Sequence, residues 1–216
     1  MKYKAAVFDM DGTILNTLQD LMDSTNYALS INNMPNRTYE EVRFFVGNGI
    51  RKLIERAVPK NASEQQIEKV FNDFNEHYKI HCADKTCAYQ GIPEAIKELK
   101  KAGIRTAVVS NKADYGVQEL VEIYFKGLFD VAIGETEGVA KKPAPDMVLK
   151  ALKGLNISQK DAVYIGDSDV DFQTAQNSNL DFIGVDWGFR GRAFLEKLGA
   201  KTIVDNACEL VETIRK

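Results

Sequence analysis

Short apolar runs alternate with amphipathic stretches over the second half of the chain. Each run is too short for a helix and is followed by residues whose apolar positions recur three and four apart. The runs lie at 106–109, 129–133, 162–165, 180–185 and 202–204. This alternation is typical of a parallel β-sheet with helices on both faces. We therefore predict an α/β fold for this part of the chain.

One further apolar run, Ala5-Ala6-Val7-Phe8, stands near the N-terminus and has the pattern of a buried strand. The residues after it show helical spacing only, with two capping-box sequences and no convincing strand. We predict two domains, an α/β core formed by 1–16 and 86–216 and an inserted α-helical cap formed by 17–85. An insert directly after the first strand is expected to lie over the carboxyl ends of the strands, where open parallel sheets bind ligands.

The first strand ends at Asp9-Met10-Asp11-Gly12-Thr13. Residues two apart in an extended backbone face the same side, so Asp9 and Asp11 are expected to aim at one point. Gly12 permits a tight turn, and Thr13 offers a hydroxyl and an amide beside the carboxylates. Two crowded carboxylates favour a hard divalent cation such as Mg²⁺. The alternative is an ordinary turn with two solvated acids, since so short a motif recurs by chance.

Later strand ends supply matching chemistry and decide between these alternatives. The second strand delivers Ser110-Asn111, whose hydroxyl and amides suit phosphate oxygens. The loop after the third strand holds Lys141-Lys142-Pro143, and the fourth strand ends at an acidic cluster, 166–171, that contains Asp167 and Asp171. Alone, these are a helix cap, a solvated loop and an acidic helix N-terminus. Together, at successive strand ends, they predict one site.

Composition narrows the function classes. The 216 residues carry 28 Lys and Arg against 31 Asp and Glu, a net charge of −3, which favours neither a nucleic-acid partner nor a membrane surface. The chain shows no long apolar signal region, and its three cysteines are irregularly spaced, so we expect no disulfide framework and a cytoplasmic protein. The sequence leaves open a monomer or a homodimer.

These motifs resemble those of the haloacid dehalogenase superfamily over essentially the whole chain. Two further stretches, 46–49 and 184–190, resemble its phosphoglycolate phosphatase-like branch. The resemblance implies a Rossmann-like core with a helical cap and a Mg²⁺-dependent phosphatase acting on a small phosphorylated metabolite. One departure is Asn16-Thr17, where the family pattern has Asp-Ser at the hinge into the cap.

The resemblance also implies roles for individual residues. Asp9 is the expected nucleophile, which forms an aspartyl-phosphate, and Asp11 is the expected acid and base for the leaving group and the water. The expected Mg²⁺ ligands are Asp9, the backbone carbonyl of Asp11 and Asp167, with Asp171 at the edge of the coordination sphere. The remaining expected contacts to the phosphoryl group are Lys142 as the cationic clamp, with Ser110, Asn111 and Thr13 around the oxygens.

In the cap, the turn Gly47-Asn48-Gly49 is expected to approach the substrate, with Arg51 or Lys52 offering positive charge. The alternative is a flexible turn between helices. Two other enzymes fit the core motifs, a phosphomutase like β-phosphoglucomutase and a pyrophosphatase. The second acid and the acidic cluster argue against a dehalogenase, and the complete acidic set argues against a non-enzymatic binding module.

Overall fold

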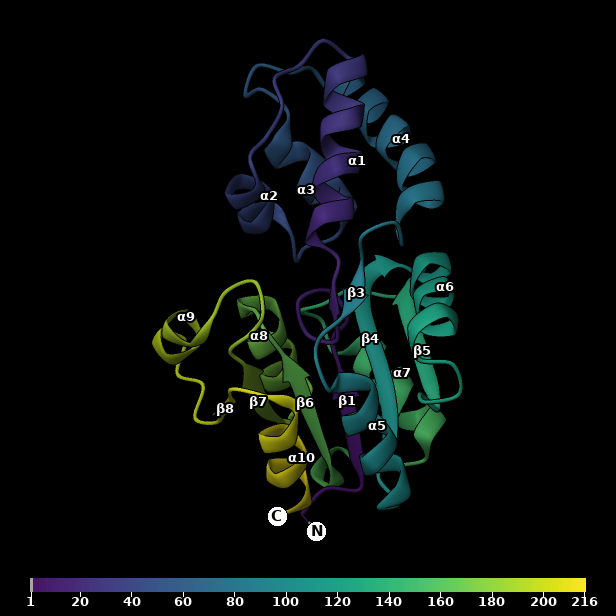
Figure 1. Cartoon of the computed structure of the whole chain (residues 1–216), viewed down its shortest axis with the longest axis vertical. Coiled ribbons are helices and arrows are strands. Elements are labelled where there is room, and N and C mark those ends of the chain that lie inside the picture. Colours follow the sequence, from purple (N-terminus) through teal and green to yellow (C-terminus); the bar gives the residue numbers. More distant parts are fainter. Residues whose placement is uncertain (1) are drawn as a thin grey trace. The chain divides into compact units, whose positions relative to one another are not determined.

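The computed structural model describes residues 2–216, which form two compact units (Figure 1). One unit combines the N-terminal segment through Leu15 with Ala88–Lys216, and the other is Asn16–Cys87. At the two crossings between units, the short strands β2 (Leu15–Asn16) and β3 (Cys87–Ala88) pair with each other. Two-residue strands are too short to leave a periodic pattern, and sequence analysis did not predict them.

A six-stranded parallel sheet forms the centre of the larger unit, as the alternating pattern predicts. The spatial order is β5-β4-β1-β6-β7-β8, so β1 lies between β4, which carries Ser110 and Asn111, and β6, which ends just before Asp167. Parallel strands place these ends at the same edge of the sheet. The strands are β1 (Ala5–Phe8), β4 (Arg105–Ala113), β5 (Val131–Glu135), β6 (Ala162–Gly166), β7 (Asp181–Val185) and β8 (Ile203–Val204).

Helices cover both faces of this sheet (Figure 1). Two of them, α5 and α10, contact each other on one face, and α7 packs on β1, β4 and β5 from the other. The helices are α5 (Ile92–Lys101), α6 (Asp114–Tyr124), α7 (Asp146–Leu155), α8 (Asp169–Asn177), α9 (Arg192–Lys197) and α10 (Ala207–Arg215), with a 3-10 turn at Gln159–Asp161.

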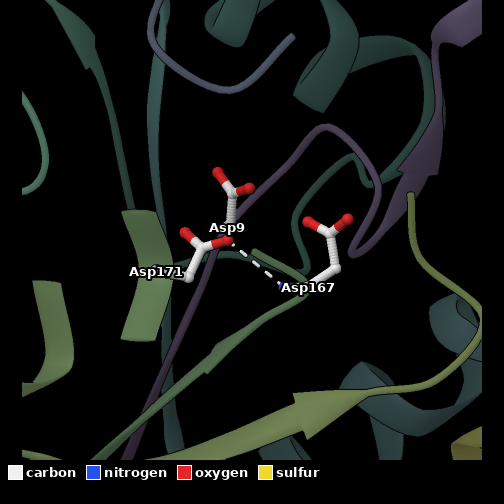
Figure 2. Close-up of side chains that lie close together, drawn as sticks. All are labelled: Asp9, Asp167 and Asp171. Carbon is white, nitrogen blue, oxygen red and sulfur yellow. Dashed lines mark hydrogen bonds between the residues drawn. The ribbon is translucent and has the colours of Figure 1, made fainter. Parts of the chain in front are cut away.

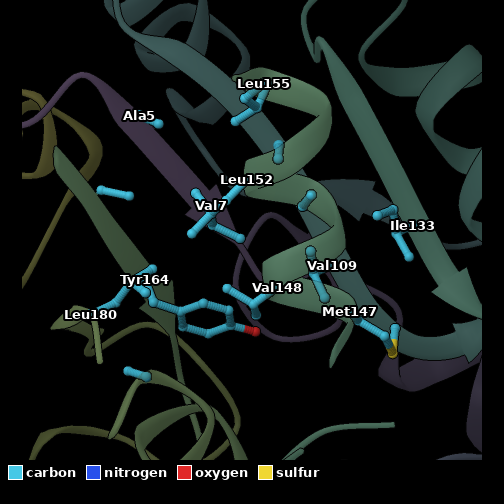
Figure 3. Packing of buried hydrophobic residues seen from close by; sticks show 14 residues of the cluster. Ala5, Val7, Val109, Ile133, Met147, Val148, Leu152, Leu155, Tyr164 and Leu180 are labelled. Atoms are coloured by element: carbon cyan, nitrogen blue, oxygen red, sulfur yellow. The ribbon is translucent and has the colours of Figure 1, made fainter. Parts of the chain in front are cut away.

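The core on the α7 face shows how the strand pattern is used. Val7 of β1 and Val109 of β4 pack against Val148 and Leu152 of α7, and all four are buried (Figure 3). The intervening residues of β1 are buried on the opposite face, which explains the near-continuous apolar run. Tyr164 of β6 belongs to this cluster, its ring lies beside Val148 in Figure 3, and its hydroxyl accepts a hydrogen bond from Lys142 Nζ at 3.1 Å.

Two strands differ in extent from their prediction. β4 continues past the predicted end at 109 to Ala113, with a shift of register against β5 between Val109 and Ala113. The predicted strand ended at 109 because the residues that follow are polar. The structure nevertheless buries them. β5 begins at Val131 rather than at 129, since Phe129 packs edge-to-face on Phe8 and Phe125 instead.

The smaller unit contains helices between its terminal residues Asn16 and Cys87, as its pattern predicts. Both capping boxes are present: Thr38 and Glu41 exchange hydrogen bonds at the start of α2, and Ser63 and Gln66 do so at the start of α4. None of the helices within residues 2–216 is long and apolar enough to span a membrane. The helices of this unit are α1 (Leu18–Ile31), α2 (Tyr39–Phe45), α3 (Ile50–Ala57) and α4 (Glu64–His81).

Candidate active site

Three buried carboxylates meet at the carboxyl edge of the sheet. Asp9 follows β1, Asp167 follows β6, and Asp171 lies in the first turn of α8, with oxygens within 4.8 Å of one another (Figure 2). Burial, and next the charge of Asp171, raise the pKa of Asp9 well above its usual value and that of Asp167 to about 7. Crowded buried carboxylates are stabilised by a cation between them.

The side chain of Lys142 provides one such cation. Its Nζ donates to Asp9 Oδ1 at 2.6 Å and to Asp171 Oδ1 at 2.8 Å. Burial alone would lower the pKa of Lys142, but the two carboxylates outweigh that effect and hold the ammonium charged. Its neighbour Lys141 pairs with Glu135 at 3.2 Å instead. The structure therefore brings Lys142, and not Lys141, into the aspartate cluster.

Both carboxylate oxygens of Asp171 are already used within the protein. Oδ1 accepts from Lys142 and also from the Tyr164 hydroxyl at 3.2 Å, whereas Oδ2 accepts from the Ser168 hydroxyl at 2.6 Å. Oδ2 also accepts from the backbone amides of Asp167 and Ser168, which completes a capping box at the start of α8. Asp171 thus holds Lys142 and caps a helix, and Asp9 and Asp167 are the better-suited direct ligands for a divalent cation.

Asp167 is held by a loop that reaches the site from beyond β7. The backbone amide of Phe189 donates to Asp167 Oδ2 at 2.6 Å. A Cβ on Gly188 would lie 2.2 Å from the Asp167 Cβ, and a Cβ on Gly12, which has φ of +88°, would lie 2.5 Å from Asp167 Oδ2. Only glycine lets the backbone approach so closely at both positions. Buried carboxylate oxygens in this arrangement fit a hard cation such as Mg²⁺.

The sequence-based expectation aims Asp9 and Asp11 at one point, and the structure places Asp9, but not Asp11, in the three-aspartate cluster. β1 ends at Phe8, and the chain then turns, with the Thr13 amide donating to the Met10 carbonyl, so the alternation of an extended strand no longer applies. The carboxylate of Asp11 lies outside the aspartate cluster and pairs with Lys112 Nζ at 3.3 Å. The resemblance implies a metal contact through the backbone carbonyl of Asp11, and this contact stays a prediction.

Thr13 joins the site through its backbone as well as its side chain. Its carbonyl accepts from Trp187 Nε1 at 3.0 Å, which ties the first motif to the loop beyond β7. Its hydroxyl is buried and has no hydrogen-bond partner within residues 2–216. A buried hydroxyl without a partner is costly, so it is suited to receive an oxygen of a ligand.

The end of β4 contributes a residue that sequence analysis did not single out. Lys112 is buried at the end of this strand, and its backbone amide donates to Ser110 Oγ at 3.2 Å. Asn111 binds the backbone of Lys142, in the loop after β5. Its side chain accepts a hydrogen bond from the Lys142 amide at 2.8 Å and donates one to the Lys142 carbonyl at 3.0 Å. The Asn111 side chain therefore positions Lys142, a role that the predicted phosphate contact did not include.

The predicted substrate contacts of the helical unit form a separate, internally bonded group. Gly47 and Gly49 have φ of +118° and +85°, and Asn48 accepts from Arg56 at 2.8 Å. Arg51 pairs with three glutamates of its own unit and lies over the ring of Phe71; the glutamates are Glu55, Glu64 and Glu68. Arg51 is thus engaged inside the helical unit, and its contact with a substrate stays a prediction.

Several known proteins resemble this chain in sequence over most of its length. The family model of haloacid dehalogenase-like hydrolases matches residues 6–185. Phosphoglycolate phosphatase of Psychrobacter arcticus is 31% identical, covering 100% of this chain and 97% of its own. Pyrophosphatase PpaX of Bacillus cereus is 26% identical, covering 98% of this chain and 96% of its own.

A solved structure extends the match to three dimensions. A Lactobacillus delbrueckii subsp. bulgaricus protein, assigned as a phosphoglycolate phosphatase, shares 41% identity with a TM-score of 0.95 and 99% coverage of both chains. The family model spans the segments that hold Asp9, Lys142 and Asp167, and the sequence match and the fold agree. The chain belongs to the haloacid dehalogenase-like hydrolase family.

Proposed function

We propose that this protein is a Mg²⁺-dependent phosphatase that hydrolyses a small phosphomonoester, of the phosphoglycolate type, through an aspartyl-phosphate on Asp9. The observation that carries the proposal is the contact of Lys142 Nζ with Asp9 Oδ1 at 2.6 Å inside a buried aspartate cluster. A lysine held against a buried carboxylate can neutralise an incoming phosphoryl group beside the attacking oxygen. The names of the relatives support the same class.

In this proposal Asp9 attacks phosphorus while Lys142, held by Asp171 and Asn111, balances the charge on the phosphoryl oxygens. The Ser110 hydroxyl and the Asn111 amide bind other phosphoryl oxygens. Asp9, Asp167 and the Asp11 carbonyl would hold Mg²⁺, which neutralises charge on the phosphoryl group as a Lewis acid when bound.

Asp11 handles the protons. It donates a proton to the leaving alkoxide, and the resulting carboxylate then takes a proton from the water that hydrolyses the aspartyl-phosphate. Its position outside the aspartate cluster supports this division, because its carboxylate is left to the leaving-group side rather than to the metal.

A second candidate substrate is inorganic pyrophosphate. It presents the same phosphoryl group with phosphate as the leaving group, and a relative of similar coverage is named as a pyrophosphatase. The partner in either case is a small phosphorylated metabolite, and the protein acts as a monomer or homodimer. A panel of such compounds, assayed for phosphate release with Mg²⁺, identifies the substrate.

The test of the mechanism is Asp9→Asn in the same assay. Asn retains the shape but cannot act as the attacking carboxylate, so we expect kcat to fall by about 10⁴-fold or more. Wild-type protein quenched in acid during turnover should carry covalent phosphate, and the variant should carry none. EDTA should abolish turnover, and added Mg²⁺ should restore it.

Asp161→Asn is the matched control, since Asp161 pairs with Lys4 far along the sheet from the cluster. It should leave kcat unchanged. An Asp9→Asn variant that keeps more than a tenth of wild-type activity would show that another group attacks phosphorus.

A further inference from the structure

The larger unit contains a second buried lysine beside the site, Lys112, and this lysine has no role in the proposed reaction. Lys112 is 4% exposed, and its Nζ lies 3.3 Å from Asp11 Oδ1. Removing an ammonium group from water is costly unless opposite charge or a ligand compensates it. Asp11 supplies opposite charge at 3.3 Å, so an ion pair with a buried lysine stands beside the aspartate cluster.

The fold builds Lys112 into place. The register of β4 shifts between Val109 and Ala113, so the segment that holds Lys112 leaves the regular ladder at the carboxyl edge of the sheet. Its side-chain stem runs along Gly116 in α6, where a Cβ would lie 3.4 Å from the Lys112 Cδ. Its carbonyl passes so close to Gly134 that a Cβ there would lie at 2.8 Å. The path of this lysine is thus determined by backbone contacts on both sides.

Lys112 and Lys142 serve different sides of the site. Lys142 contacts Asp9 and Asp171, on the side of the attacking carboxylate. Lys112 contacts Asp11, which in the proposed reaction hydrogen-bonds the leaving oxygen. A leaving oxygen that is hydrogen-bonded to Asp11 Oδ1 at about 2.7 Å lies within about 6 Å of Lys112 Nζ, so the ammonium can reach a group two bonds further into the leaving group.

We propose that Lys112 is a specificity residue, which binds a second anionic group that the leaving group carries beside the ester oxygen. This inference rests on the proposed function and adds the substrate class: phosphoryl compounds with a carboxylate or phosphate next to the bond that breaks. Such a group would be repelled by the carboxylate of Asp9, and the Lys112 ammonium offsets that repulsion. A neutral leaving group gains nothing from it, so Lys112 discriminates between the two kinds.

The test compares an anionic substrate with its neutral counterpart in the Mg²⁺-loaded full chain. The substrates are 2-phosphoglycolate and its carboxamide, with pyrophosphate as a third arm and p-nitrophenyl phosphate as a general phosphatase substrate. The variants are Lys112→Met, which keeps length and removes charge, and Lys112→Arg, which keeps charge. Lys126→Met removes an exposed lysine and serves as the control.

We expect Lys112→Met to lower kcat/KM for phosphoglycolate about 10- to 100-fold more than for the carboxamide, as loss of a charged hydrogen bond implies. Lys112→Arg should retain most of the preference, and Lys126→Met all of it. A charge-specific loss seen only with pyrophosphate supports the inference with phosphate as the bound group. Equal losses on all substrates overturn it, because they assign Lys112 to positioning Asp11.

A measurement on the wild type covers the case in which Lys112→Met does not fold. 3-Phosphonopropionate, a non-hydrolysable analogue of phosphoglycolate, should inhibit at least about tenfold more tightly than its carboxamide. Equal inhibition constants overturn the inference. If the wild type hydrolyses p-nitrophenyl phosphate but prefers neither phosphoglycolate nor pyrophosphate to the carboxamide, the inference about Lys112 is wrong and the proposed phosphatase function stands. If it hydrolyses none of the four compounds, the proposed function fails as well.

Discussion

The two units use their charged residues in opposite ways. In the larger unit, Asp9 follows β1, Asp171 lies in the first turn of α8 and Lys142 lies in the loop after β5, yet they are buried together. In the helical unit, Arg51 forms partly exposed ion pairs with glutamates of the same bundle, and Arg56 donates a hydrogen bond to the Phe45 carbonyl. The difference shows which charges the fold concentrates for chemistry and which it uses to hold helices together.

The physical reason lies in the cost of burial. Bringing like charges together away from water is unfavourable, and the larger unit offsets it with a lysine, a helix cap and glycine clearances around Asp167. Exposed ion pairs such as those of Arg51 carry little cost and contribute about 1 kcal/mol or less. The contrast between the buried and the exposed charges predicts four effects of decreasing size.

The largest effect should separate two adjacent lysines. Lys142→Met removes the ammonium that contacts Asp9, and we expect kcat to fall about 10²- to 10³-fold. Lys141→Met removes an equal charge that pairs with Glu135 and should change kcat less than twofold. Steady-state phosphate release measures both. Similar losses in the two variants would show that the general positive charge of the loop matters, and not the buried contact.

Next comes the glycine that makes room for Asp167. In Gly188→Ala the new methyl group must displace Asp167, so the Mg²⁺ concentration for half-maximal activity should rise about 10- to 100-fold. Gly154→Ala is the control. Gly154 lies in α7, and a Cβ there would contact only the side chain of Val131 in β5. Unchanged Mg²⁺ dependence in a folded Gly188→Ala protein would remove the Phe189 loop from the metal site.

Acid should weaken the metal site. Asp167 must lose its proton to bind Mg²⁺, and its pKa of about 7 in the metal-free protein means that the apparent Mg²⁺ affinity falls below pH 7, by up to about tenfold per pH unit. The raised pKa of Asp167 has the opposite effect on the stability of the metal-free protein, which it increases at low pH. Folded Asp167 keeps its proton where the unfolded chain has lost it, so this contribution to the free energy of unfolding is full below pH 3.8 and declines toward pH 7.

Titration calorimetry with Mg²⁺ between pH 5.5 and 8, at values chosen around that pKa, measures the first effect, and denaturant unfolding in EDTA measures the second. An affinity that does not vary with pH over that range would place the pKa of Asp167 near its ordinary value.

The smallest effect belongs to the helical unit. Arg51→Met should lower the unfolding midpoint by about 2 to 4 °C and leave kcat/KM nearly unchanged, because Arg51 is bonded to three glutamates of its own unit. Arg43→Met, which removes a single pair with Glu40, should shift the midpoint less. The contrast between the units would break if Arg51→Met lowered kcat/KM tenfold at an unchanged midpoint, which would instead support the predicted substrate contact.

Sequence reasoning reached the parts of the site that sit directly at strand ends. Asp9 and Asp167 each follow an apolar run, and the order of parallel strands brings such positions together without further information. The capping boxes were predicted for a similar reason, since Thr38 and Glu41 interact within one turn. In these cases the pattern and the contact span the same few residues.

The parts that were missed depend on contacts between distant segments. Lys112 gave no signal because a lysine after a strand is ordinarily solvated, and only the continuation of β4 buries it. Tyr164 has the pattern of a core strand residue, and its hydroxyl contacts Lys142 only through the fold. Gly188 stands in a loop, and its need for glycine becomes visible only beside Asp167.

The loop beyond β7 has a consequence for the order in which the protein matures during synthesis. Trp187 binds the Thr13 carbonyl, and Phe189 binds Asp167, across separations of 174 and 22 residues. Asp9 is synthesised long before these two supports, so a nascent chain stopped at residue 185 holds Asp9, Asp167 and Asp171 without the amide that orients Asp167. We therefore expect metal binding to become possible only after the loop beyond β7 has been synthesised.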